Sequence, residues 1–119
     1  MRNKEKVLLA ALYECDEKKL DDPELLSSVL EGCAKVLGVD IKMPASYKYH
    51  PYGVTSVKII AESLLSISTY PEHRSALVYL SSCNLSSNMR GGLAYIKASL
   101  FSKECRIYYE EEIPLDEIV

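Results

Sequence analysis

Apolar side chains recur along this chain with two periodicities, one typical of helices and the other of strands. Spacing of three and four residues predicts a first helix, with Asp22 as its N-cap, Pro23 at its first position and Gly38 as its stop. The same spacing predicts a second helix over residues 89–100. The residues expected to be buried are Leu26, Val29, Leu30, Cys33, Val36 and Leu37 in the first helix, and Met89, Leu93, Ile96 and Leu100 in the second.

Six apolar runs predict strands at residues 7–14, 39–43, 54–61, 64–70, 75–83 and 105–109. In the fifth run, Leu77 and Tyr79 should lie on one face, and Val78 and Leu80 on the other. Residues 44–53 are predicted to form an aromatic-rich connection, and residues 110–117 an acidic, solvated tail. The order β-α-β-β-β-β-α-β predicts an α+β two-layer sandwich, with a mostly antiparallel sheet and both helices on one face.

Length and charge restrict the function classes. The 119 residues suit a single domain spanning 1–119. A net charge of −3, with no basic stripe, argues against nucleic-acid binding. No apolar run is long enough to span a membrane. Basic residues precede the apolar segment 7–13, as in a signal peptide, but acidic residues follow it without a small-residue cleavage site. We therefore interpret this segment as a buried first strand.

The cysteines Cys15, Cys33, Cys83 and Cys105 form no C-x-x-C pair, and there are only two histidines. These residues do not have the spacing of a metal site, so we expect no metal. Four reduced thiols are typical of a cytoplasmic protein.

One region has a more specific pattern. Residues 51–56 read Pro-Tyr-Gly-Val-Thr-Ser, and residues 61–72 read Ala-Glu-Ser-Leu-Leu-Ser-Ile-Ser-Thr-Tyr-Pro-Glu. This pattern resembles the processing region of the prokaryotic S-adenosylmethionine decarboxylases, in which a Gly-Val-Ser-Gly element precedes Glu-Ser-His-Leu-Ser-Ile-His-Thr-Trp-Pro-Glu and a Thr-Cys. Cys83 falls at the cysteine of that pattern, and residues 13–16 fit the end of the family's first strand. The resemblance extends over nearly the whole chain.

The resemblance implies a pyruvoyl enzyme of polyamine and spermidine biosynthesis. The hydroxyl matching Ser63 attacks the carbonyl of the residue matching Glu62, and the resulting ester eliminates to leave a pyruvoyl group derived from Ser63. That ketone takes the substrate's amino group and acts as an electron sink while carbon dioxide leaves. The cysteine matching Cys83 reprotonates the product carbon.

The resemblance also implies S-adenosylmethionine as the ligand. The acid matching Glu72 holds the ribose hydroxyls, and the aromatic residue matching Tyr49 stacks on adenine. Leu65 and Tyr70 complete the expected substrate-binding set. Enzymes of this family are two-layer folds that dimerise, with active sites at the subunit interface. Independently, the expected strands carry apolar side chains on both faces, which also predicts a homodimer.

This sequence departs from the family pattern where protons are handled. Leu64 and Ser68 stand in place of the two motif histidines, and Thr55 stands in place of a serine that works with the second of them. Ser56 replaces a glycine, and Val7 and Ala11 replace a histidine and an acid of the first strand. A hydroxyl is no general base at neutral pH, so these changes bear directly on self-cleavage.

Three functions remain open at this stage. The first is a self-cleaving S-adenosylmethionine decarboxylase proenzyme, with Ser63, Cys83, Ser68 and Thr55 as its catalytic residues. The second is an uncleaved, non-catalytic paralogue that regulates or stabilises an active partner. The third is a pyruvoyl decarboxylase of another amino acid.

Overall fold

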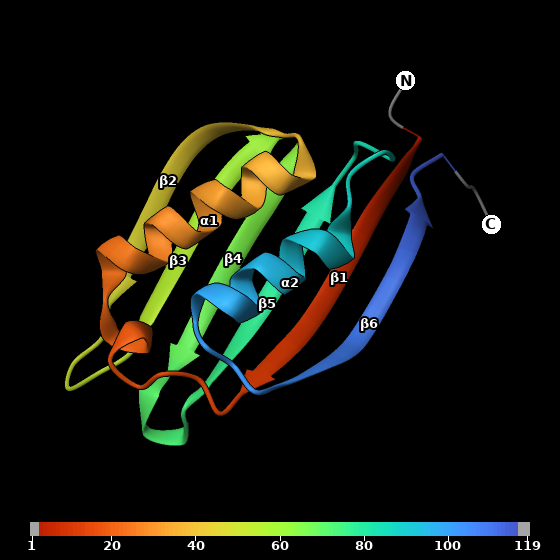
Figure 1. Ribbon diagram of the computed structural model, residues 1–119. Coiled ribbons are helices and arrows are strands. Elements are labelled where there is room, and N and C mark those ends of the chain that lie inside the picture. Colours follow the sequence, from red (N-terminus) through yellow and green to blue (C-terminus); the bar gives the residue numbers. More distant parts are fainter. Residues whose placement is uncertain (1–2, 117–119) are drawn as a thin grey trace.

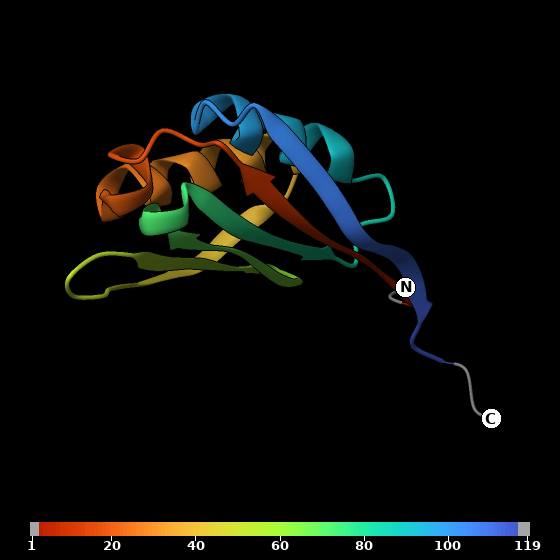
Figure 2. The same ribbon diagram turned by 90° about the horizontal axis from the view of Figure 1, so that it is seen from below.

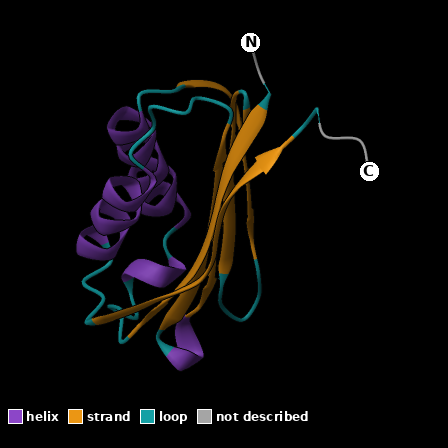
Figure 3. Ribbon diagram, turned by 90° about the vertical axis from the view of Figure 1, so that its right-hand side faces the viewer, coloured by secondary structure: helices purple, strands orange, loops and turns teal. Residues whose placement is uncertain are grey.

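The computed structural model describes residues 3–116 as one six-stranded antiparallel sheet with two helices packed on one face (Figure 1). The sheet order is β2-β3-β4-β5-β1-β6. The predicted α+β two-layer architecture is confirmed, and Figure 3 shows both helices on the same side of the sheet. The elements are β1 (Lys4–Tyr13), η1 (Lys19–Asp21), α1 (Pro23–Leu37), β2 (Asp40–Lys48), β3 (Val54–Ala61), β4 (Ser63–Tyr70), η2 (Pro71–His73), β5 (Ser75–Ser82), α2 (Met89–Ser99) and β6 (Glu104–Pro114).

Both helices begin at a side-chain cap. The Asp22 carboxylate accepts a hydrogen bond from the Leu25 amide at 3.1 Å, and Gly38 ends α1 with φ at 73°. The Asn88 side chain accepts from the Gly91 amide at 2.9 Å at the start of α2. The predicted apolar stripes are buried except at Val36, which is 40% exposed. Val36 lies at the margin of the apolar stripe of α1, where its side chain reaches solvent.

The core lies between the helices and one face of the sheet. Leu8 and Leu12 of β1, Ile67 of β4, and Val78 and Leu80 of β5 are fully buried there. Alternate residues point to the opposite face, where Ile59 is 46% and Leu77 is 44% exposed. No described helix covers that second face, which we call the open face (Figures 2 and 3).

Two strands are longer than the sequence predicts. β2 continues through Pro44 to Lys48, because β2 is an edge strand and tolerates a residue without an amide proton. β6 continues to Pro114, so Glu110, Glu111 and Glu112 are exposed, as predicted, but lie on a strand and not in a tail. They are tolerated because β6 is the other edge, and Glu112 pairs across from Lys6. Glu117, the end of the predicted tail, lies outside the described residues.

The N-terminal apolar segment forms β1, which is hydrogen-bonded between β5 and β6, as the interpretation of residues 7–13 as a buried strand requires. Among the described residues, no helix is long and apolar enough to cross a membrane.

Candidate functional site

The sequence-predicted site residues fall into two groups, at opposite ends of β4. Glu62, Ser63 and Cys83 lie at the beginning of this strand, whereas Tyr49, Thr55, Ser68, Tyr70 and Glu72 gather toward its end. Ser63 and Ser68 are five residues apart on one extended strand, a separation of about 17 Å. Within a single chain, the two groups therefore cannot act on the same bond.

The first group surrounds the peptide bond between Glu62 and Ser63. The amide of Cys83 donates a hydrogen bond to the Glu62 carbonyl oxygen at 3.3 Å, which polarises that carbonyl toward attack by a nucleophile. Ser63 has φ at 124°, a conformation that is disfavoured for any residue with a Cβ. The Ser63 hydroxyl is hydrogen-bonded to the hydroxyl of Ser81.

The Cys83 thiol has an acidic neighbour that the sequence did not reveal. Its Sγ donates to the carboxylate Oε1 of Glu5 at 3.7 Å. Because β1 and β5 are paired with Lys6 opposite Ser82, Glu5 comes to lie beside Cys83 although 78 residues separate them. No local pattern could have predicted this contact, because it depends on the register of two distant strands.

The second group is built on the pairing of β3 with β4. Thr55 lies opposite Ser68, and their hydroxyl oxygens are 3.1 Å apart. The Tyr49 hydroxyl lies 3.2 Å from the Thr55 hydroxyl. Together these groups form a chain of three hydroxyls on the open face.

This second group surrounds a cavity of about 250 Å³. Its lining contains five predicted residues and three that the sequence analysis did not single out: Tyr49, Thr55, Ser68, Tyr70 and Glu72, with Tyr52, Gly53 and Thr69. Tyr52 and Glu72 also line an adjacent hollow with Glu17 and Asp21. The cavity is thus aromatic on its walls and acidic at one end, which suits a flat ligand that carries hydroxyl groups or a positive charge.

The loop that forms one wall is held by Asp21. Its carboxylate accepts a hydrogen bond from the Gly53 amide at 2.7 Å and forms an ion pair with Lys48 at 2.9 Å. The hydrogen bond from Gly53, followed by that from Lys48, lowers the pKa of Asp21. Gly53 has φ at 109°, which glycine adopts without a Cβ clash.

One predicted substrate-binding residue does not join either group through its side chain. Leu65 is fully buried in the core, because alternate residues of β4 point toward the helices. Its side chain does not line the cavity, so a contact of Leu65 with a ligand, which stays a prediction, would have to be made by its backbone.

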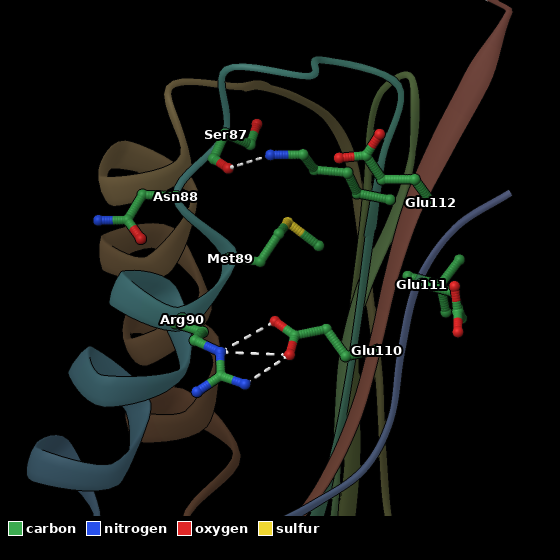
Figure 4. A pocket seen from close by; sticks show the side chains of 9 residues that line it. Ser87, Asn88, Met89, Arg90, Glu110, Glu111 and Glu112 are labelled. Carbon is green, nitrogen blue, oxygen red and sulfur yellow. Dashed lines mark hydrogen bonds and ion pairs between the residues drawn. The ribbon is translucent and has the colours of Figure 1, made fainter.

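A larger hollow of about 460 Å³ lies on the helix side, between α2 and β6 (Figure 4). It contains none of the predicted site residues, and three of its charged side chains have partners inside the protein. Arg90 binds Glu110 through two nitrogens at 2.6 to 3.2 Å, and the Lys6 ammonium donates to the Ser87 carbonyl at 3.1 Å. Size alone therefore does not identify the site.

The remaining cysteines are structural. Burial raises the pKa of Cys33 to about 12 and also raises the pKa values of Cys15 and Cys105, which makes thiolate formation unfavourable. Within residues 3–116, no three or more His, Cys, Asp or Glu side chains cluster in a way that could hold a metal ion.

Comparison with known sequences agrees with this arrangement. A family profile described as S-adenosylmethionine decarboxylase matches residues 6–111. The chain is 32% identical over 111 residues to an S-adenosylmethionine decarboxylase proenzyme of Thermotoga petrophila, covering 93% of this chain and 85% of that protein. It is 36% identical over 93 residues to the proenzyme of the same name from Caldanaerobacter subterraneus, covering 78% of this chain and 75% of that protein.

Comparison of the folds gives the same result. The crystal structure of the adenosylmethionine decarboxylase from Aquifex aeolicus superimposes with a TM-score of 0.86 and 30% sequence identity. The superposition covers 98% of this chain and 96% of that chain, so the similarity includes the sheet and both helices.

Proposed function

This chain belongs to the S-adenosylmethionine decarboxylase family, and we propose that it is a proenzyme that cleaves itself between Glu62 and Ser63 and then decarboxylates S-adenosylmethionine in polyamine biosynthesis. The observation that carries the proposal is the geometry at the start of β4. Ser63 follows a carbonyl that is polarised by the Cys83 amide, and the thiol of the same cysteine is hydrogen-bonded to Glu5. These are the parts that self-cleavage and reprotonation of the product carbon require.

The residues present fit a pyruvoyl group derived from Ser63. The hydroxyl and the Glu62 carbonyl that would form it are adjacent, and the disfavoured backbone conformation of Ser63 marks a position under functional constraint. A pyruvoyl group supplies an electrophilic carbonyl that accepts electrons as carbon dioxide leaves the substrate. The Cys83 thiol supplies a proton to the product carbon, and Glu5 holds that thiol in place.

The site is completed by a second copy of the chain. Ser68 lies about 17 Å from Ser63 along β4, and Thr55 lies opposite Ser68 on β3. A two-fold axis at the open face would bring this hydroxyl pair of one copy to Ser63 of the other. The exposed apolar residues of that face, Ile59 and Leu77, support burial against a like surface. Each site then combines Ser63 and Cys83 of one protomer with the Tyr49–Glu72 cavity of its partner.

The cavity lined by Tyr49 and Glu72 suits S-adenosylmethionine. Tyr49 offers a ring for adenine and for the sulfonium charge, and Glu72 offers acceptors for the ribose hydroxyls. Tyr70 and Tyr52 add to the walls. We assign the protein to the cytoplasm, the reducing compartment that suits its four free thiols.

Intact mass spectrometry of the purified chain tests this proposal. We expect two fragments, covering residues 1–62 and 63–119, with the second starting in pyruvoyl, and release of carbon dioxide from S-adenosylmethionine. Cleavage without turnover of S-adenosylmethionine would favour a pyruvoyl decarboxylase of another amino acid. A chain that stays whole at 13.4 kDa after prolonged incubation contradicts the proposal.

One observation favours a second candidate function. The Tyr49–Thr55–Ser68 chain contains three hydroxyls and no imidazole, and a hydroxyl does not accept a proton readily at neutral pH. An uncleaved paralogue that stabilises an active homologue would need only the fold and the open face. Its signature is an intact chain that co-purifies with an active decarboxylase and raises its activity.

A further inference from the structure

Ser81 lies directly beside the serine that starts β4. Its side chain is fully buried, and its hydroxyl is bonded to that of Ser63. The β4–β5 ladder starts at the pair Leu65 and Leu80. One residue beyond that pair, the Ser81 hydroxyl is hydrogen-bonded to the backbone amide and carbonyl of Leu64. Ser81 Oγ accepts from the Leu64 amide at 3.3 Å and donates to the Leu64 carbonyl at 3.3 Å.

The hydrogen-bond capacity of a serine hydroxyl fixes the direction of the remaining bond. Ser81 has one proton, which it gives to the Leu64 carbonyl, and it has two acceptor sites. One of these sites takes the Leu64 amide, so the other is left for Ser63. With its one proton given to the Leu64 carbonyl, Ser81 accepts from the Ser63 hydroxyl, which leaves the lone pairs of Ser63 without a role in this bond.

We propose that Ser81 is a positioning residue for self-cleavage, which orients the Ser63 hydroxyl with its proton away from, and its lone pairs toward, the Glu62 carbonyl. This inference rests on the proposed function. In the step concerned, the bond from Ser63 Oγ to the Glu62 carbonyl carbon forms and the Glu62–Ser63 peptide C–N bond breaks. The hydroxyl proton ends on the Ser63 nitrogen, so the step is an isomerisation that needs no other reactant.

The role of Ser81 differs from that of the other hydroxyls at the site. Ser68 is about 17 Å away along β4, and Thr55 lies opposite it on β3, so this pair reaches Ser63 only through a second copy. Ser81 acts within the same chain. Its hydroxyl is held by hydrogen bonds to backbone groups of Leu64, so the position of this hydroxyl does not depend on the conformation of another side chain. Misplacement of a reacting group by about 1 Å can cost about 10²-fold in rate.

The test compares the rate of peptide scission in full-length Ser81→Ala, Ser81→Cys and Ser81→Thr with that of the wild-type chain. Ser82→Ala is the matched control, because Ser82 is equally buried but bonds to Ser87 and the Asn84 amide. We expect scission to slow about 10²-fold in Ser81→Ala and Ser81→Cys, to recover partly in Ser81→Thr, and to stay unchanged in Ser82→Ala. Ser81→Cys keeps the site filled if Ser81→Ala does not fold.

A second measurement separates positioning from a structural role. Hydroxylamine cleaves an ester once it has formed, so it should not restore scission in Ser81→Ala when the melting temperature shows that the variant is folded. Restoration by hydroxylamine would place the defect after attack and overturn the inference. Scission at the wild-type rate in Ser81→Ala would overturn it while leaving the proposed function intact, whereas a whole wild-type chain would overturn both.

Discussion

At the residue scale, the main question is what replaces the missing imidazole. Ser68 and Thr55 share a hydrogen bond at 3.1 Å, and neither hydroxyl accepts a proton readily near neutral pH. Ser68 lies against a cavity of about 250 Å³, so a larger side chain has room there. The structure therefore permits the chemistry to be restored by side-chain replacement.

Ser68→His should raise the rate of scission at Glu62–Ser63, by about 10²-fold or more if proton transfer limits it. Imidazole has an unperturbed pKa near 6.5 and accepts a proton where a hydroxyl does not. The measurement is the fraction of cleaved chain over time on a denaturing gel. The triple change Leu64→His, Ser68→His and Thr55→Ser, made in parallel, restores the family pattern more fully.

Ser63→Ala in each of these backgrounds must abolish scission, because it removes the nucleophile. If every variant with an added histidine folds and dimerises but is cleaved no faster than the wild type, an imidazole at these positions does not assist scission.

Cys83→Ser should separate the two reactions of the site. Scission should persist, because the Cys83 backbone amide still donates to the Glu62 carbonyl. Decarboxylation should fall by about 10²-fold or more, since a hydroxyl is a much weaker acid than a thiol. Release of carbon dioxide and the gel pattern measure the two steps separately. Cys105→Ser, at a half-buried core thiol, should change neither, and equal loss of both steps in Cys83→Ser would contradict the assignment.

At the element scale, the two helices meet at a glycine. A Cβ built on Gly32 of α1 would lie 2.1 Å from the Tyr95 hydroxyl of α2. The Tyr95 side chain is 40% exposed and can turn toward solvent, so Gly32→Ala should destabilise the fold by at most about 1 kcal/mol after the better helix propensity of alanine is included. Urea denaturation measures the change. Adding Tyr95→Ala should remove most of the penalty of Gly32→Ala, and strictly additive effects would show that the two helices do not meet in this way.

The loop beside the cavity depends on the charge of Asp21. The folded-state pKa of this carboxyl is lowered below 3.8, so its contribution to stability is complete above about pH 5 and is lost as the pH falls through the folded pKa. Asp21→Asn should cost about 1 kcal/mol or less at pH 7, because the Lys48 pair is partly exposed, and a smaller amount near pH 2.5, because the cost falls as the carboxylate is protonated.

Urea unfolding of the wild type and Asp21→Asn at both pH values checks this dependence. Asp40→Asn, at an exposed position of β2, is the control. An Asp21→Asn penalty of equal size at both pH values would contradict the role of its charge.

At the scale of the whole molecule, the open face should be buried against the open face of a second copy in a homodimer. Light scattering should give a mass near twice the 13.4 kDa of one chain. Leu77→Glu should lower this mass toward that of a monomer and also stop scission, because Ser63 loses the partner's hydroxyl pair. Val36→Glu, on the helix side, should do neither. A wild-type mass near 13 kDa at micromolar concentration would contradict the prediction.

Much of this architecture could be predicted from local patterns. The caps at Asp22 and Gly38 fix the limits of α1, and the alternation of Leu77 and Val78 assigns the two faces of β5. Local patterns failed to predict the full length of the two edge strands, β2 and β6. Pro44 and the acids of β6 look like loop or tail residues, but both lie on edge strands where solvent solvates them.

The sequence by itself determined the secondary elements, the α+β class and the family resemblance, because each depends on residues close together in the chain. Only the tertiary structure decided that Glu5 meets Cys83, that Ser81 holds Ser63, and that Leu65 faces the core. These contacts follow from the register of the strands. The register is fixed cooperatively, because one whole face of the sheet must be buried. The same register separates Ser63 from Ser68 by the length of a strand, which is why the proposed site needs a second chain.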